Sequence, residues 1–87
     1  MEIVKTASAG TLESSDVYVE IEPGCGQLDI QLESVVKVQF GEAIEAAVRD
    51  VLAEQGVVDA NVRITDRGAL ECVIRARVET AILRGKE

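Results

Sequence analysis

The chain has 87 residues, of which 47% are hydrophobic and 2% aromatic, and its formal net charge is −7. Residues 1–87 are expected to form one small domain with a single core of aliphatic side chains. The acidic excess disfavours phosphate backbones and anionic lipid, which argues against nucleic acid and membrane surfaces as direct partners.

Three strands are predicted in the first part of the chain. Residues 7–12 form a weak candidate strand. In residues 17–22 and 27–33 apolar and polar side chains alternate strictly, which is typical of half-buried strands. The residues PGCG at 23–26 favour a turn, so we predict that these two strands pair as a β-hairpin.

The period of the apolar residues then changes to that of a helix. From about Val36 they recur at spacings of three and four, and Phe40 is the first large member of this stripe. Glu45 and Arg49 are placed on the opposite face as an i,i+4 pair. Gly56 is a typical residue at the end of a helix, so the predicted helix stops there.

A fourth strand and a second helix follow. Residues 61–65 alternate again, and Asp66 is the predicted N-cap of a helix over residues 69–83. The back face of this helix is small and apolar, which suits either an ordinary surface or a docking patch for a partner subunit. Its members are Ala69, Cys72, Ala76 and Leu83. Six apolar residues of the two helices are expected to be buried together, namely Phe40, Ile44, Val48, Leu70, Ile74 and Val78.

The predicted order of elements is β-β-β-α-β-α. A sheet with two helices on one face buries both helical stripes. The sequence therefore predicts an α+β fold, with a small antiparallel or mixed sheet and two helices packed on one face.

The residues needed for most kinds of catalysis are missing. The chain has no histidine, so a serine nucleophile lacks its usual base and a zinc site lacks ligands. Cys25 and Cys72 form no C-x-x-C pair, which leaves two reduced thiols or a single bridge between them. No apolar run has the length of a membrane span or a signal peptide. We expect a cytoplasmic protein that is not itself an enzyme and binds no metal.

The sequence GTLESSD at residues 10–16 places Ser14 and Ser15 between two carboxylates. Such a stretch is typical of a polar turn in which Asp16 or Ser15 bonds nearby backbone amides. An accessible hydroxyl in a turn also suits modification by another protein. Because this turn makes no obvious apolar contact, we expect it to be mobile.

Three segments resemble the acyl carrier proteins of citrate lyase, the gamma subunits of that complex. They are AGTLESSD at residues 9–16, VQFG at 38–41 with the helix after it, and DRGALECVIRAR at 66–77. The match extends in order over nearly the whole chain. The family pattern places its serine directly after Leu-Glu, which falls on Ser14, and an Asp two residues later, which falls on Asp16.

This resemblance implies that Ser14 carries phosphoribosyl-dephospho-coenzyme A through a phosphodiester bond. The arm ends in a thiol that holds acetyl or citryl as a thioester. It also implies three partners: an alpha subunit that exchanges acetyl for citryl, a beta subunit that cleaves the citryl group, and a transferase that loads the arm. The alternatives are the carrier subunit of malonate decarboxylase and a non-catalytic adaptor without a prosthetic group.

Overall fold

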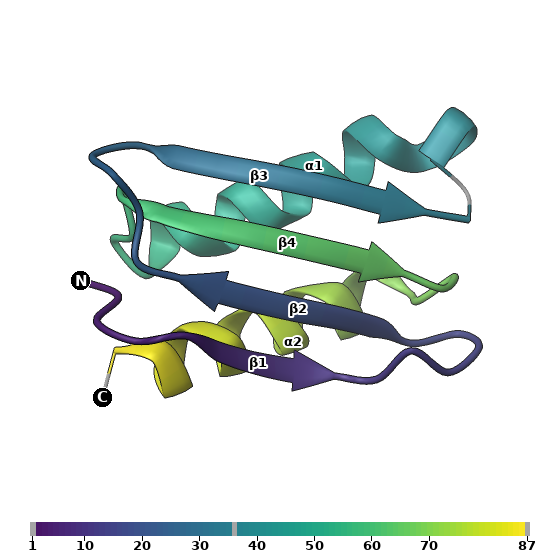
Figure 1. Ribbon diagram of the computed structural model, residues 1–87. Helices are drawn as coiled ribbons and strands as arrows, with labels where there is room; N and C mark the ends of the chain where they lie inside the picture. Colours follow the sequence, from purple (N-terminus) through teal and green to yellow (C-terminus); the bar gives the residue numbers. More distant parts are fainter. Residues whose placement is uncertain (1, 36, 87) are drawn as a thin grey trace.

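The computed structural model describes residues 2–35 and 37–86, without the side chains of residues 37–39. Its elements are β1 (Ala7–Gly10), β2 (Val17–Glu22), β3 (Leu28–Ser34), α1 (Lys37–Glu54), β4 (Ala60–Asp66) and α2 (Glu71–Gly85). The strands form one four-stranded mixed sheet, and both helices lie on the same face of it (Figure 1). The predicted α+β class and order of elements are confirmed. The predicted helix start near Val36 lies outside the described residues.

The strands pair in the order β1-β2-β4-β3. β1 runs antiparallel to β2, β2 antiparallel to β4, and β3 parallel to β4. The predicted hairpin between residues 17–22 and 27–33 is therefore wrong, because β4 lies between these two strands. Alternation indicates which face of a strand is buried, but it does not identify the neighbouring strand. The hairpin that does form joins β1 to β2, with Gly10 opposite Tyr18.

The core lies between the sheet and the two helices. Four of the six expected residues are buried in it, namely Ile44, Val48, Ile74 and Val78. The prediction is wrong for Phe40 and Leu70, whose exposed fractions are 54% and 72%. Phe40 lies in the first turn of α1 and Leu70 is the N-cap of α2, so both lie at the starts of the helical stripes. Together they line a shallow groove between the starts of the two helices.

The start of α2 also differs from the prediction. Its N-cap is Leu70, without a side-chain hydrogen bond, so the assignment of Asp66 as N-cap is wrong. Asp66 is buried at the end of β4, and its Oδ1 accepts hydrogen bonds from the amides of Gly68 and Ala69 at 3.2 and 3.0 Å. Its Oδ2 accepts one from the hydroxyl of Ser34 at 2.7 Å. Asp66 thus shapes the loop before the helix and joins it to the end of β3.

The back face of α2 is exposed at Cys72, Ala76 and Leu83, as predicted. Ala69, which lies in the loop before this helix, is half-buried. Within the described residues, neither helix is long and apolar enough to cross a membrane.

Candidate functional site

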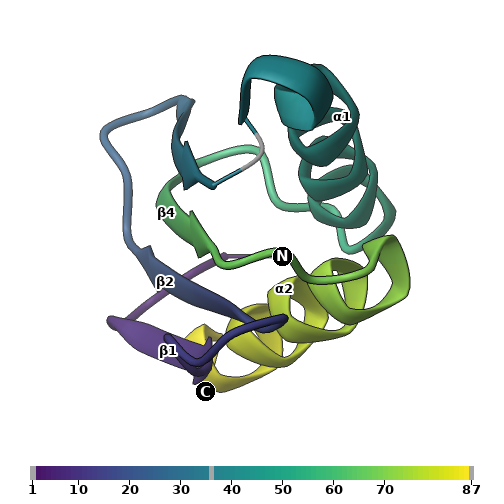
Figure 2. The ribbon, with the colours of Figure 1, turned by 90° about the vertical axis from the view of Figure 1, so that its right-hand side faces the viewer.

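The segment Thr11 to Asp16, called the 11–16 loop below, joins β1 to β2 at one end of the sheet. Val17, which follows it, lies opposite Asp66 at the end of β4. Figure 2 looks at this end of the molecule and shows the loop beside α2. The 11–16 loop is therefore an exposed corner of the fold, next to the loop from which the last helix starts.

The tip of the 11–16 loop is a tight turn. The amide of Asp16 donates a hydrogen bond to the carbonyl oxygen of Glu13 at 3.2 Å. Ser15, the third residue of this turn, has a φ of 64°, the only positive value for a non-glycine residue among residues 2–35 and 37–86. A positive φ at the third position is the requirement of a type II β-turn, which glycine meets most easily. Ser14 occupies the second position, and both serines are exposed.

The Ser14 hydroxyl is chemically passive in this setting. Among the described residues, no hydrogen bond reaches it from a side chain or from the backbone. A serine hydroxyl needs an adjacent base to act as a nucleophile at neutral pH. Among the described residues, no side chain is therefore hydrogen-bonded to Ser14 as a base would be.

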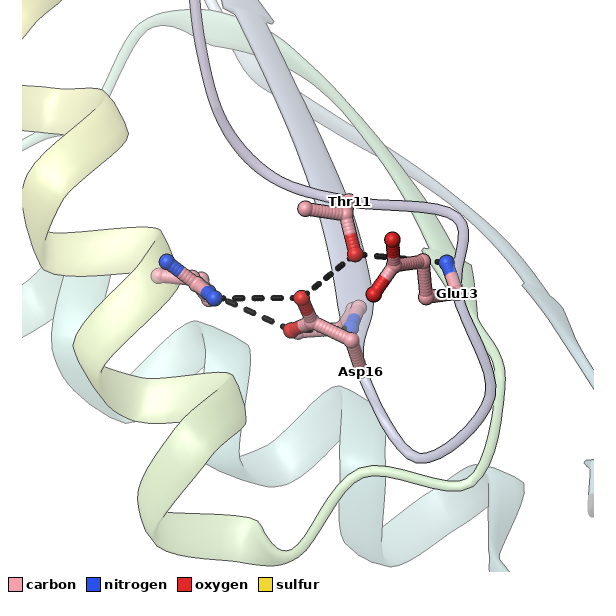
Figure 3. A network of polar contacts seen from close by, with 5 residues as sticks. Thr11, Glu13 and Asp16 are labelled. Atoms are coloured by element: carbon pink, nitrogen blue, oxygen red, sulfur yellow. Dashed lines mark hydrogen bonds and ion pairs between the residues drawn. The ribbon is translucent and has the colours of Figure 1, made fainter.

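Asp16 fixes the base of the 11–16 loop (Figure 3). Its Oδ2 accepts a hydrogen bond from the Thr11 hydroxyl at 2.6 Å, and its Oδ1 accepts one from the amide of Val17 at 2.7 Å. The guanidinium of Arg77 in α2 makes two further bonds to the same carboxylate, at 3.2 and 3.1 Å. One carboxylate thus joins both ends of the loop to the last helix.

These contacts also determine how Asp16 titrates. The hydrogen bond from the Thr11 hydroxyl and then that from the Val17 amide are the main causes that lower the pKa of Asp16 from 3.8 to about 2. Partial burial opposes them, and Arg77 adds a smaller lowering. Each of these partners binds the ionised carboxylate, which favours the charged form. Asp16 therefore stays ionised, and keeps its contacts, throughout the neutral and mildly acidic range.

The backbone provides a second attachment. The amide of Ser15 donates to the carbonyl oxygen of Arg67 at 2.8 Å, and the amide of Arg67 donates to that of Asp16 at 2.9 Å. The amide of Glu13 donates to the Thr11 hydroxyl at 3.2 Å. Three of the four amides from Glu13 to Asp16 are therefore bonded, which argues against the uniform mobility expected from the sequence. The loop is polar and exposed, yet it is held in place.

Sequence reasoning missed the roles of Arg67 and Arg77 in this site. A signal for Arg77 was present in its helix. Arg75 has Glu71 four residues before it, and the two bond at 3.2 Å, whereas Arg77 has Val73 and Ala81 at the corresponding positions. An arginine without an acidic neighbour on its own helix points to a partner elsewhere. Arg67 acts through its backbone alone, for which the sequence holds no signal.

The two cysteines take no part in the 11–16 loop. Cys25 lies between β2 and β3 and Cys72 in α2, and both are free and exposed, so no bridge joins them. Within the part of the chain that the structure describes, no three His, Cys, Asp or Glu side chains are placed to hold a metal ion.

Known proteins resemble this chain over nearly its full length. The family described as malonate decarboxylase delta subunit (MdcD), an acyl carrier protein family, matches residues 4–85. The citrate lyase acyl carrier protein of Escherichia fergusonii is 57% identical over 89 residues, covering 100% of this chain and 91% of that protein. Its counterpart in Haemophilus influenzae is 54% identical over 87 residues, covering 100% and 90%.

Two solved structures share the fold. A chain in the crystal structure of a Pseudomonas malonate decarboxylase hetero-tetramer in complex with malonate has a TM-score of 0.81 and 25% identity, covering 97% of this chain and 87% of that chain. A Thermus thermophilus protein with 14% identity and a TM-score of 0.57 shares the fold alone, covering 97% of this chain and 16% of that one. The chain therefore belongs to the family of acyl carrier proteins that includes those of citrate lyase and malonate decarboxylase.

Proposed function

We propose that this chain is the acyl carrier subunit of a cytoplasmic citrate lyase, that residues 1–87 act as one carrier domain, and that Ser14 is the attachment point of its prosthetic group. One observation supports the assignment of Ser14 most directly: its hydroxyl is exposed and unbonded in a turn whose neighbours are fixed. At the family level, relatives named citrate lyase acyl carrier protein are 53% to 57% identical to this chain. The malonate decarboxylase chain is 25% identical.

The residues around Ser14 are compatible with a phosphoribosyl-dephospho-coenzyme A arm. The turn is held by the Ser15 amide and the Asp16 carboxylate, and neither contact uses the Ser14 side chain. A bulky substituent on the Ser14 oxygen therefore extends into solvent without displacing a core residue. When bound, the arm supplies a thiol on which an acyl group is held as a thioester.

In this role the chain positions the arm and does no chemistry of its own. Asp16 and Arg77 hold the base of the 11–16 loop against α2, so the attachment point keeps one geometry relative to the body of the carrier. The proposed partners are an alpha subunit that transfers the acyl group, a beta subunit that cleaves the citryl group, and a transferase that loads Ser14. Tethering keeps the acyl group at a high effective concentration near both active sites.

The turn geometry supports Ser14 over its neighbour Ser15. Ser15 has a positive φ, which glycine adopts without strain. Glycine can therefore form the same turn, and the turn needs no hydroxyl at this position. Ser14 lies at the second position of the turn and directly follows the Leu-Glu pair that the family pattern places before its serine.

The experiment is loading by the cognate prosthetic-group transferase, read by tandem mass spectrometry. We expect the adduct on a peptide containing Ser14, its loss in Ser14→Ala, and its retention in Ser15→Gly. Ser15→Gly is the matched control because it removes the second hydroxyl while keeping the turn. Loading of Ser14→Ala at the wild-type level would refute the assignment.

Malonate decarboxylase is the second candidate complex, favoured by the description of the matching family and by the TM-score of 0.81. Loaded carrier should restore citrate cleavage to the alpha and beta subunits of citrate lyase, and it should not restore malonate decarboxylation to the corresponding carrier-free complex. The opposite result would identify the other complex. A protein of unmodified mass from a host with both sets of loading enzymes would indicate an adaptor.

A further inference from the structure

The outer edge of β3 is long and open. β3 is the edge strand opposite β1, and it has seven residues against four in β1 (Figure 1). Its sequence, LDIQLES, contains no proline, no glycine and no basic residue. Edge strands present backbone N–H and C=O groups to other chains, and proteins usually protect them with short strands, proline, lysine or bulges. β3 is seven residues long and has no proline, lysine or bulge, and its only charged residues are the acidic Asp29 and Glu33.

A groove runs along this edge on the side of the helices. Its volume is about 700 Å³. Ile30 and Leu32 of β3 form one wall and are only half-buried. The other wall belongs to α1 and combines two small residues, Gly41 and Ala46, with three charged ones, Glu42, Glu45 and Arg49. A strand added beside β3 would place alternate side chains in this groove, against the two half-buried residues. Those positions therefore favour apolar side chains.

The other face of the same strand is acidic. Asp29, Gln31 and Glu33 are exposed on the sheet face that carries no helix, and Figure 2 shows that this face is uncovered. On β2 the same face carries Glu20 and Glu22. The basic residue there is Arg63 of β4, which is already paired with Glu20 at 3.4 Å. The intervening side chains of an added strand would lie next to Asp29 and Glu33, and those positions therefore favour lysine or arginine.

Charge also disfavours three of the registers in which a second copy of this chain could be the added strand. Antiparallel pairing of two β3 strands centred on Gln31 would place Asp29 of one copy directly opposite Glu33 of the other. If the pairing were centred on Asp29 or on Glu33 instead, that residue would lie directly opposite the same residue of the other copy. Like charges directly opposite on neighbouring strands are destabilising, so each of these registers is disfavoured.

We propose that the β3 edge is a docking site for an extended segment of another protein, in which apolar residues alternate with basic ones. The segment adds a fifth strand to the sheet, its apolar side chains fill the groove beneath α1, and its basic side chains face Asp29 and Glu33. This surface lies at the β3 edge of the sheet, and β1, which leads into the 11–16 loop, forms the other edge. The carrier is thus bound through its body while Ser14 stays free.

The test uses the full chain and a synthetic peptide of the length of β3 that alternates valine with lysine. The control peptide alternates valine with glutamate. We expect saturable binding of the lysine peptide, with NMR shift changes concentrated on residues 28–34 and on the flank of α1 around Ala46. We expect no such binding of the glutamate peptide. Shift changes centred on another surface, or equal binding of the two peptides, would overturn the proposal.

Two variants separate the groove from general charge attraction. Ala46→Trp fills the groove and should weaken binding about tenfold or more, whereas Ala53→Trp, at an exposed position of the same helix outside the groove, should not. Asp29→Lys combined with Glu33→Lys changes exposed residues only, and it should reverse the preference toward the glutamate peptide. Unchanged affinities in both Ala46→Trp and the charge-reversed variant would refute the site. These results are independent of whether Ser14 is modified.

Discussion

The two edges of the sheet are built differently. At the β1 edge, α2 and the segment before β1 close around the strand: Arg84 donates to the carbonyl oxygen of Ser8 at 2.8 Å, and the amide of Val4 donates to that of Gly85 at 2.9 Å. At the β3 edge, α1 leaves a groove and two half-buried apolar residues. The β1 edge, which continues into the 11–16 loop, is held by hydrogen bonds to α2, while the β3 edge is open.

This difference suggests a division of roles within a very small protein. A carrier must hold its attachment point in a defined geometry and must also offer its partners a surface. Under the two proposals above, the first task falls to β1, β2 and α2, and the second to β3 and α1. The predictions below test whether the two sides differ in stability as well as in shape.

The largest difference is expected from truncating one isoleucine on each side. Ile74 of α2 is 2% exposed, and Ile74→Ala should cost about 2–5 kcal/mol of unfolding free energy. Ile30 of β3 is half-buried, so Ile30→Ala should cost about 1 kcal/mol, because less apolar surface returns to water. Urea denaturation measures both. Equal losses would show that the two sides are packed alike.

A pair of glycines gives a second comparison. Gly10 and Gly26 have similar backbone conformations, with φ of 93° and 102°. A Cβ at Gly10 would overlap the carbonyl oxygen of Val17, whereas one at Gly26 would meet nothing within 4 Å. Gly26→Ala should therefore cost about 1–2 kcal/mol from the left-handed conformation alone. Gly10→Ala should cost about 2–4 kcal/mol, since the clash adds to that strain. Similar denaturation midpoints for the two variants would contradict the close approach of the hairpin strands.

Acid should lower the stability of the β1 side of the molecule by protonating Asp16. Its pKa is about 2 in the folded protein and 3.8 ordinarily, so the ionised carboxylate stabilises the fold fully above about pH 4. This contribution is lost as the pH falls from about 4 towards 2. Denaturation midpoints across this range should fall more steeply for the wild type than for Asp16→Asn, in which the group does not titrate. Parallel curves would show that the contacts with Thr11, Val17 and Arg77 do not form in solution.

The smallest effect is expected at the tip of the 11–16 loop, and it has the opposite sign. Ser15→Gly should stabilise the protein by about 0.5–1 kcal/mol, because relief of the left-handed conformation exceeds the entropy that glycine loses on folding. Ser14→Gly, next to it, relieves no such strain and should be neutral or destabilising. Destabilisation by Ser15→Gly would mean that its φ is not positive in solution.

The sequence was sufficient for the elements and the fold class, and insufficient for the order of the strands. The alternation in residues 17–22 and 27–33 identified both strands and their buried faces. It could not show that β4, which comes after a helix, lies between them, because pairing depends on contacts far apart in the chain. Similarly, helical spacing included Phe40 and Leu70 in the predicted core, because spacing does not show which part of a stripe is covered by the rest of the fold.

For the candidate site, the sequence nominated Ser14 and missed the contacts that surround it. Ser14 stood out through the polar turn and through the resemblance to a known family. The positive φ of Ser15 and the contact from Arg77 arise only when the hairpin and α2 lie together. The hydrogen bonds that argue against a mobile turn were hidden from the sequence for the same reason, since they come from Arg67, which follows β4, and from Arg77 in α2.

The contact between Asp16 and Arg77 joins residues 61 positions apart in the chain. During synthesis the hairpin is made before α2, so the 11–16 loop can form this contact only after α2 has been synthesised. A truncated or incompletely folded chain still displays the same serines, but without the fixed geometry around them. An enzyme that recognises this geometry would modify only finished molecules, so the contact would act as a checkpoint on the folding of its own carrier.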